Sequence, residues 1–163
     1  MALAPTVLRL ASQEETARFG GAFADAGLER GVVHLEGDLG AGKTTWVRGF
    51  LRRIGVGGAI RSPTFTLVEP YAARGLEIYH FDLYRLSDPV ELEHIGLRDY
   101  LGSGALCFFE WPERAAGVVP APDLRVRLRH EPAARAIEIH AAGEAYGRIA
   151  HEAEILFLKH SNR

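Results

Sequence analysis

Apolar residues recur along the chain at two different spacings, and their succession predicts an α/β protein. Short apolar runs at 32–35 and 105–109 are typical of buried strands. Residues 124–128 and 136–139 alternate apolar with polar positions, as half-exposed strands do, and 144–159 carries apolar residues at helical spacing. The pattern predicts a three-layer fold whose central sheet is mainly parallel, with antiparallel additions.

Capping and turn signals add further elements to this outline. Ser12 followed by Glu15 is a capping-box pattern that predicts a first helix. The runs 65–71 and 76–82 are rich in β-forming residues, and the glycine-containing stretch between them predicts a hairpin. Residues 91–101 are expected to form one broken helix or two short ones on the surface.

The most specific motif lies between the first buried run and a helical segment. It is the stretch Gly37-Asp38-Leu39-Gly40-Ala41-Gly42-Lys43-Thr44-Thr45, which fits the phosphate-loop pattern of Gly, four residues, Gly, Lys, and Ser or Thr. The run before it supplies the strand that the pattern requires, and residues 44–51 supply the helix. Its glycines allow positive φ, so that backbone amides can turn toward a phosphate. The motif predicts a P-loop NTPase-like fold with a nucleotide bound by residues 38–45.

Lys43 is unusual in a chain that strongly prefers arginine. Of the 19 lysine and arginine residues, only Lys43 and Lys159 are lysines. A compact ammonium can lie between β- and γ-phosphates, whereas the wide guanidinium of arginine cannot. We therefore expect Lys43 to bind phosphate and to take part in catalysis. The alternative is a glycine-rich turn that carries a surface lysine.

Two acidic residues end β-rich runs and are candidates for the metal and for catalysis. Glu110 follows the run 105–109, at the strand end where open α/β sheets bind ligands. Together with Thr44 it is expected to hold Mg²⁺, unless it is an ordinary turn residue. Asp82 ends the run 76–81 and is expected to orient the attacking water or share the metal; the alternative is a cap for the following turn.

Three further features could contribute to the same site. Thr64 lies in Ser62-Pro63-Thr64-Phe65-Thr66, a connection suited to closing on a γ-phosphate or, more simply, a turn with proline at its second position. Trp111 directly follows Glu110 and could either stack on a base or cover an apolar edge. His80 is more typical of a hydrogen-bonded core histidine than of a catalyst.

Length and composition restrict the class of protein. A chain of 163 residues fits one domain, residues 1–163, and its net charge of −2, with both signs interleaved, argues against a dedicated nucleic-acid surface. The single cysteine, Cys107, excludes an internal disulfide and indicates a reducing compartment. No apolar run approaches the roughly 20 residues that span a bilayer, and the N-terminus lacks the pattern of a signal peptide. We expect a cytoplasmic protein with no membrane partner.

Four blocks of the sequence together resemble one family. They are the loop 37–45, then Ser62-Pro63-Thr64-Phe65-Thr66-Leu67-Val68, His80-Phe81-Asp82-Leu83-Tyr84-Arg85-Leu86, and Glu110-Trp111-Pro112-Glu113. In their order and separation they resemble TsaE (YjeE), a family of small bacterial P-loop ATPases. The resemblance covers about residues 6–140, and the segment after Glu144 lies outside it.

The resemblance implies a role in N6-threonylcarbamoyladenosine (t6A) modification of tRNA position 37, with ATP and Mg²⁺ as ligands. In this family the protein supplies a partner-stimulated ATPase activity, while TsaD and TsaB transfer the threonylcarbamoyl group, so tRNA is reached only through the complex. The roles implied by motif position are phosphate and Mg²⁺ binding for Lys43 and Thr44, a switch for 62–66, hydrolysis for Asp82, Mg²⁺ binding for Glu110 and an edge contact for Trp111.

Two other classes of function remain open on the sequence. A small-molecule kinase also uses a phosphate loop, but we find no arginine-rich lid or acceptor-binding signature. A nucleotide-dependent binding module is the second alternative. It would have the same parts as an ATPase, but ATP hydrolysis would not be its function. No Asn-Lys-x-Asp signature for guanine occurs, which favours adenine.

Overall fold

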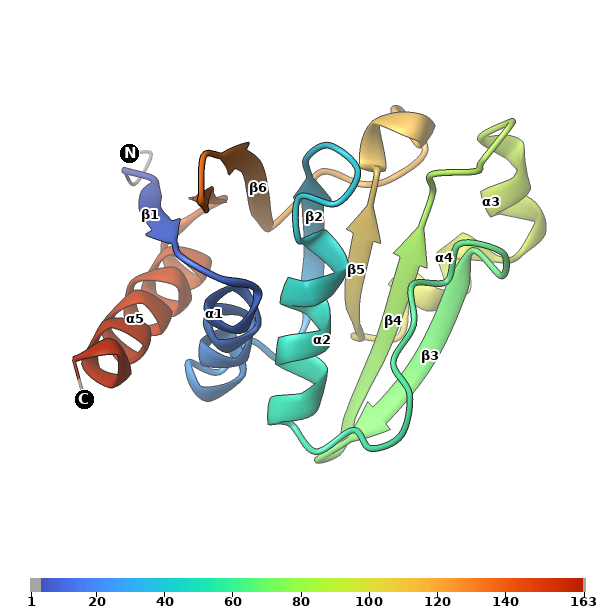
Figure 1. The fold of residues 1–163 in the computed structure, drawn as a ribbon. Coiled ribbons are helices and arrows are strands. Elements are labelled where there is room, and N and C mark those ends of the chain that lie inside the picture. The colour runs from blue at the N-terminus through green and yellow to red at the C-terminus, as the bar shows by residue number, and fades with distance from the viewer. Residues whose placement is uncertain (1–3, 163) are drawn as a thin grey trace.

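A seven-stranded sheet forms the centre of the structure, a computed structural model that describes residues 4–162. In chain order the elements are β1 (Thr6–Leu10), α1 (Gln13–Asp25), β2 (Gly31–Glu36), α2 (Lys43–Arg53), β3 (Val68–Ala73), β4 (Leu76–Asp82), α3 (Val90–His94), α4 (Leu97–Leu101), β5 (Leu106–Glu110), the 3-10 helix η1 (Pro112–Ala115), β6 (Leu124–Glu131), β7 (Ala134–Ala141) and α5 (Glu144–Ser161). The strands lie in the order β1-β7-β6-β2-β5-β4-β3 (Figure 1).

The four middle strands, β6, β2, β5 and β4, are parallel, and the other strands join antiparallel at the two margins. β2, which leads into the phosphate loop, lies at the centre of the sheet, so the predicted fold class is confirmed. The register places Leu35 of β2 beside Glu110 of β5, and Glu110 beside Asp82 of β4. The carboxyl ends of these strands therefore meet at one edge of the sheet (Figure 1).

The helices α1, α2 and α5 cover one face of the sheet, and α1 and α2 touch backbone to backbone. A Cβ on Gly49 would lie 1.8 Å from the carbonyl oxygen of Ala17, and one on Gly20 would lie 2.0 Å from that of Trp46. Only glycine fits at such approaches. This contact fixes α2, and with it the phosphate loop, against the sheet. Within residues 4–162, no helix is both long enough and apolar enough to cross a bilayer.

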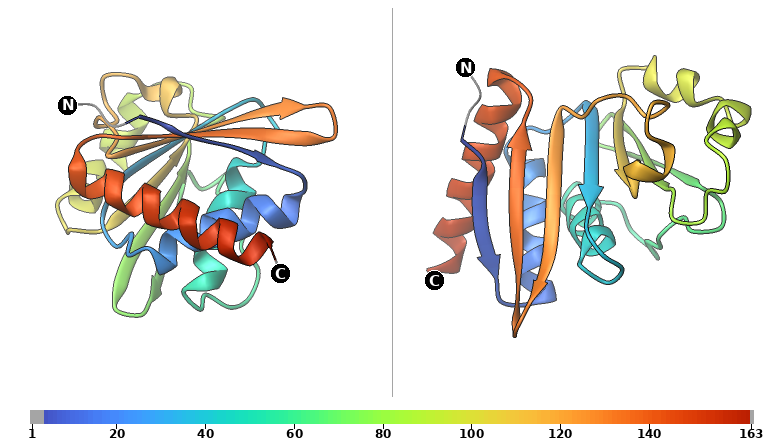
Figure 2. Two further views of the ribbon diagram at one scale, coloured as in Figure 1. Left: turned by 90° about the vertical axis from the view of Figure 1, so that its left-hand side faces the viewer. Right: turned by 90° about the horizontal axis from the view of Figure 1, so that it is seen from above.

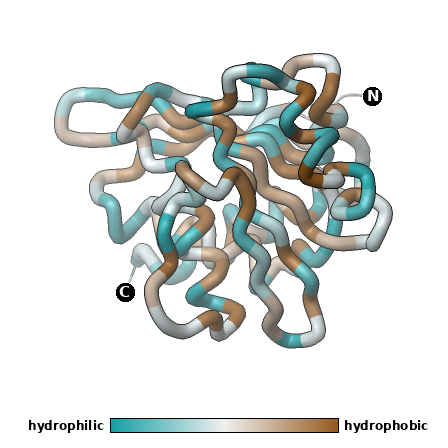
Figure 3. The backbone as a smooth tube through the Cα atoms, turned by 90° about the vertical axis from the view of Figure 1, so that its right-hand side faces the viewer, coloured by the Kyte–Doolittle hydropathy of each residue, from teal (hydrophilic) through white to brown (hydrophobic). Residues whose placement is uncertain are grey.

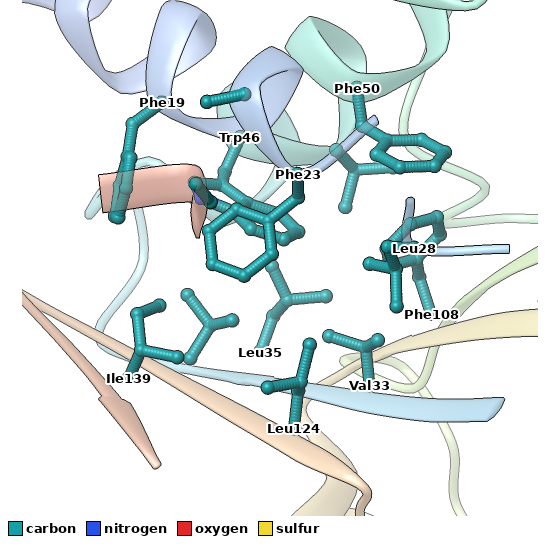
Figure 4. Packing of buried hydrophobic residues seen from close by; sticks show 14 of the residues in the cluster. Phe19, Phe23, Leu28, Val33, Leu35, Trp46, Phe50, Phe108, Leu124 and Ile139 are labelled. Carbon is teal, nitrogen blue, oxygen red and sulfur yellow. The ribbon is translucent and has the colours of Figure 1, made fainter. Parts of the chain in front are cut away.

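Aromatic side chains fill the space between these helices and the sheet (Figure 4). The ring of Trp46 on α2 lies 5.1 Å from that of Phe23 on α1 and 6.1 Å from that of Phe108 on β5. Phe50 packs edge-on against Phe108 at 5.2 Å. Large buried rings contribute much apolar area and prefer such edge-to-face geometry. The aromatic residues of the core therefore also join the loop helix α2 to β5, the strand that carries Glu110.

The opposite face of the sheet is covered over only half its width. A second apolar cluster joins α3, α4 and η1 to β4 and β5 through Leu92, Leu97 and Ala115. Apolar stretches run through the middle of the molecule beneath polar loops (Figure 3). On β6 the outward positions carry arginines, and the β6–β7 hairpin extends beyond its neighbours (Figure 2, left). The predicted three layers are present, the third being partial.

Three local predictions differ from the structure. The strand expected at 65–71 begins at Val68, because residues 64–66 form a turn that the Leu67 N–H closes on the Pro63 carbonyl at 2.9 Å. The hairpin loop contains only Arg74 and Gly75, both at positive φ. β6, expected as part of an antiparallel addition, also pairs in parallel with β2. The other expected strands and helices are present within a few residues, with two short helices on either side of Gly96.

Candidate active site

A pocket of about 460 Å³ lies at the carboxyl edge of the middle strands, where the phosphate loop, the connection before β3 and the ends of β4 and β5 converge. Its walls are Gln13, Leu39, Gly40, Gly42, Lys43, Thr44, Thr45, Ser62, Thr64, Asp82, Tyr84, Arg85, Glu110, Trp111 and Arg135. Segments far apart in the chain therefore contribute side chains to one concave site, which is the usual form of a small-molecule site.

The loop backbone has the conformation expected of an anion site. Gly40 and Gly42 have φ of 77° and 115°, in the left-handed region that other residues rarely adopt. Gly42 is the N-cap of α2, and no side chain caps that helix. The first amides of α2 are therefore free of a side-chain cap and available to an anion at the positive end of the helix.

Lys43 lies buried beneath the loop, with 4 % of its surface exposed. Its Nζ donates to the carbonyl oxygens of Gly37 and Asp38, and it lies 3.8 Å from the centre of the Trp111 ring. Burial lowers the pKa of Lys43, and the nearby carboxylate of Glu110 acts in the opposite direction. The site therefore holds a partly desolvated cation, which an anionic ligand would stabilise.

Glu110 connects the loop helix to β4 through two hydrogen bonds. The Thr44 hydroxyl lies 2.8 and 2.9 Å from the two Glu110 carboxylate oxygens, and the Nε2 of His80 lies 2.6 Å from Oε2. Glu110 is 3 % exposed and His80 is fully buried. His80 is thus a hydrogen-bonded core histidine, as its sequence context indicated, and its partner is the candidate metal ligand.

Asp82 has a separate set of donors although it is the direct neighbour of Glu110 in the sheet. The hydroxyls of Ser62 and Thr64 donate to its Oδ2, the latter at 3.3 Å, and the backbone N–H of Tyr84 donates to Oδ1 at 3.0 Å. Asp82 therefore holds the connection before β3 against the end of β4. Through Tyr84 it also caps the turn that follows β4. The structural role as a cap is therefore compatible with the expected role in catalysis.

Trp111 lies at the pocket wall in a left-handed backbone conformation, with φ of 58°. Its ring lies 5.0 Å from that of Tyr84, and the Arg114 guanidinium lies 5.9 Å from its centre. A non-glycine residue at positive φ is held there by its surroundings at some cost, which is typical of functional sites. The ring faces the Lys43 ammonium, so it does more than cover an apolar edge.

The structure brings together all but two of the residues predicted for the site. Asp38 and Ala41 do not line the pocket: Asp38 is exposed, and the Ala41 side chain packs into the core beneath the loop. Four lining residues were not predicted: Gln13, Tyr84, Arg85 and Arg135. Tyr84 and Arg85 stand in the block around Asp82, whereas nothing in the sequence links the N-terminus of α1 or the β6–β7 hairpin to the loop.

The residues present fit a magnesium ion bound together with a nucleotide. Among residues 4–162 no group of three or more His, Cys, Asp or Glu side chains is arranged to hold a metal. Mg²⁺ rarely needs such a cage, since it usually takes one or two carboxylates while phosphates and waters supply the rest. The Thr44 hydroxyl and the Glu110 carboxylate provide a hard oxygen donor set of this kind.

Comparison with known proteins places this geometry in a family. The family model described as "Threonylcarbamoyl adenosine biosynthesis protein TsaE" matches residues 10–137. The chain belongs to the TsaE family. The protein named tRNA threonylcarbamoyladenosine biosynthesis protein TsaE from Haemophilus influenzae is 50% identical over 129 residues, covering 76% of this chain and 82% of the relative. The Bacillus subtilis protein of that name is 36% identical over 148 residues, covering 88% and 90%.

A solved structure shares this fold. The crystal structure of Bacillus subtilis YdiB matches this TsaE-family chain with a TM-score of 0.78 at 29% sequence identity, covering 94% of this chain and 96% of that chain. The similarity therefore extends beyond the loop to nearly the whole fold.

The buried charge of Lys43 leads to a prediction about stability. Because its pKa in the folded protein is below its ordinary value of 10.5, the charged form favours the unfolded chain. We expect Lys43→Met to unfold at a higher urea concentration than the unsubstituted protein, measured at pH 7 without nucleotide. The difference should shrink as the pH rises from the lowered pKa toward 10.5.

Lys159 offers a matched control, because it is the only other lysine and lies exposed near the end of α5. Lys159→Met should leave the urea midpoint nearly unchanged. A lower midpoint for Lys43→Met than for the unsubstituted protein would contradict the prediction and would mean that the contacts of the ammonium outweigh its desolvation.

Proposed function

We propose that this TsaE-family protein binds ATP with Mg²⁺ in the loop pocket and hydrolyses it to ADP and phosphate, and that this ATPase acts on the TsaD–TsaB complex in t6A modification of tRNA position 37. The observation that carries the proposal is the contact of Thr44 with Glu110 beside the buried Lys43. It unites a phosphate-binding backbone, a cation and a metal-binding oxygen pair in one pocket. The tRNA would be reached only through the partner complex.

Each residue has a defined task in this proposal. The amides of residues 39–45 and the Lys43 ammonium bind the phosphates, which release the ammonium from the Gly37 and Asp38 carbonyls. Thr44 and Glu110 hold Mg²⁺, which when bound neutralises charge on the phosphate oxygens. Asp82, at the neighbouring strand end, accepts a hydrogen bond from the attacking water and so orients it. Trp111 screens the phosphates from solvent.

A thermal-shift experiment with Lys43→Met tests nucleotide binding. A ligand that binds only the folded state stabilises it by about 2.7 kcal/mol at roughly 100 times its Kd. We expect ATP with Mg²⁺ to raise the melting temperature of the unsubstituted protein and of Lys159→Met, and to leave that of Lys43→Met almost unchanged. An equal rise in all three proteins would exclude the loop as the site.

A second prediction separates the two carboxylates. Glu110→Gln should weaken the dependence of ATP binding on Mg²⁺, because Glu110 belongs with Thr44 to the metal donor set. Asp82→Asn should bind ATP with Mg²⁺ nearly as the unsubstituted protein does but hydrolyse it at least about 100-fold more slowly, since positioned proton acceptors contribute on the order of 10² to 10⁴ in rate. Binding is measured by calorimetry and hydrolysis by phosphate release with TsaD and TsaB present. Unimpaired turnover in both variants would reduce the two acids to structural roles.

A third prediction concerns the connection before β3. Hydrolysis can act on a partner only if ATP and ADP stabilise different conformations, and Thr64 both lines the pocket and contacts Asp82. We expect Thr64→Ala to reduce the difference in TsaD–TsaB affinity between the ATP and ADP states while leaving ADP affinity intact.

Thr66 is the natural control for this experiment. Its hydroxyl donates to Glu69 at 3.1 Å and does not line the loop pocket. Thr66→Ala should therefore preserve the difference between nucleotide states, measured by titration of the partner complex. If Thr64→Ala preserves it too, the conformational switch lies outside residues 62–66.

A further inference from the structure

His80 is a fully buried side chain in β4 that faces the candidate metal ligand. In the sheet it is the register partner of Phe108, two residues before Glu110 on β5. Its Nε2 lies 2.6 Å from Glu110 Oε2, whereas its Nδ1 has no hydrogen-bond partner among the residues that the structure describes. The imidazole thus makes one polar contact, and that contact is with Glu110.

A buried histidine with an unpartnered nitrogen is a poor choice for filling a core. A buried polar atom without a partner destabilises the folded state, and Ile78 and Phe108 next to His80 belong to the apolar cluster beneath α2. An apolar side chain at position 80 would pack in those surroundings without that cost. The contribution that offsets the cost of the unpartnered Nδ1 must come from the hydrogen bond between His80 and Glu110.

His34 shows what a structural histidine looks like in the same sheet. It lies in β2, is buried, and its Nε2 lies 2.9 Å from the carbonyl oxygen of Pro120, in the segment that leads into β6. That hydrogen bond joins a strand to a connecting segment, and neither His34 nor Pro120 lines the loop pocket. His80 differs because its partner is a side chain that lines the pocket.

The direction of the hydrogen bond follows from the chemistry of the two groups. A carboxylate only accepts, so Nε2 carries the proton that points at Glu110, whether the ring is neutral or charged. Thr44 donates to the same carboxylate from the loop helix. Glu110 is therefore held from two sides, by a hydroxyl that the metal would also contact and by an imidazole that lies outside the pocket wall.

We infer that His80 is the positioning residue of the magnesium site: its Nε2–H fixes the Glu110 carboxylate in the orientation that binds the metal of a metal–nucleotide complex. The inference rests on the proposed function, since it concerns the site at which nucleotide and Mg²⁺ would bind. Asp82 cannot replace His80 in this role, because Asp82 is itself a carboxylate beside Glu110 and donates nothing. Without the Nε2–H donor, Glu110 would turn away from this neighbouring negative charge.

The expected effect is a loss of metal affinity rather than of nucleotide affinity. Removing a group that orients a metal-binding side chain typically weakens metal binding about 10- to 100-fold. The loop amides and Lys43, which contact phosphates, remain intact. We therefore expect the Mg²⁺ concentration for half-maximal nucleotide binding to rise at least about 10-fold, with little change in affinity measured in EDTA.

Two amide variants test the inference. His80→Gln places an N–H donor near the position of Nε2, whereas His80→Asn is one methylene shorter and cannot reach Glu110. His34→Asn is the matched control for loss of a buried strand histidine. The binding of ADP is followed by calorimetry in EDTA and across a Mg²⁺ titration, and melting temperatures of all variants are recorded without nucleotide.

We expect His80→Asn to show the rise in Mg²⁺ requirement and His80→Gln to remain within about threefold of the unsubstituted protein, whereas His34→Asn lowers the melting temperature alone. An unchanged Mg²⁺ requirement in His80→Asn would overturn the inference while leaving the proposed function standing. If the unsubstituted protein binds nucleotide with no dependence on Mg²⁺, the proposed metal site itself fails, and the inference with it.

A measurement on the unsubstituted protein tests the same point independently of how well the variants fold. Nitrogen-15 NMR of the His80 ring should show a proton on Nε2 in the presence and absence of Mg²⁺ and ADP. A bare Nε2 with the proton on Nδ1 would overturn the inference, because such a tautomer cannot donate to Glu110.

Discussion

The contact between Thr44 and Glu110 is the interaction on which the site depends. It joins the first turn of α2 to the last residue of β5, and it exists because the parallel register of β2 and β5 places Leu35 beside Glu110. A slip of that register by one residue would turn Glu110 to the opposite face of the sheet. The aromatic packing of α2 against β5 and the glycine contact of α1 with α2 both stabilise the same alignment.

Two neighbouring carboxylates at this edge create an electrostatic problem that the fold resolves with separate donors. Glu110 receives Thr44 and His80, whereas Asp82 receives Ser62, Thr64 and the backbone of Tyr84. The two adjacent carboxylates therefore share no donor, and each is oriented by its own set of hydrogen bonds. The separation also divides the pocket into a part connected to the loop helix and a part connected to the segment before β3.

Stability and function make opposite demands at Lys43 and His80. Burial disfavours the charge of Lys43, and His80 leaves one nitrogen without a partner among the described residues. One cost falls in the pocket wall and the other directly behind Glu110, whereas the surrounding core is apolar. Such local deviations from the rules that stabilise a fold are expected where groups are held ready for a ligand. The apolar clusters on the two faces of the sheet supply the stability that offsets these costs.

The sequence by itself determined the order of elements, the phosphate loop and the identity of Glu110 and Asp82 as acids at strand ends, because these depend on hydrophobic spacing and on local turn chemistry. It offered a turn within 62–66 only as an alternative, and it did not determine where that turn lies or that the backbone of the following Leu67 adopts a positive φ. Nor did it indicate that Arg135, near the end of the β6–β7 hairpin, and Gln13 of α1 join the pocket wall, or that His80 contacts Glu110. Those facts arise from pairings between residues distant in the chain, and only the register of the strands and the packing of α1 against α2 decide them.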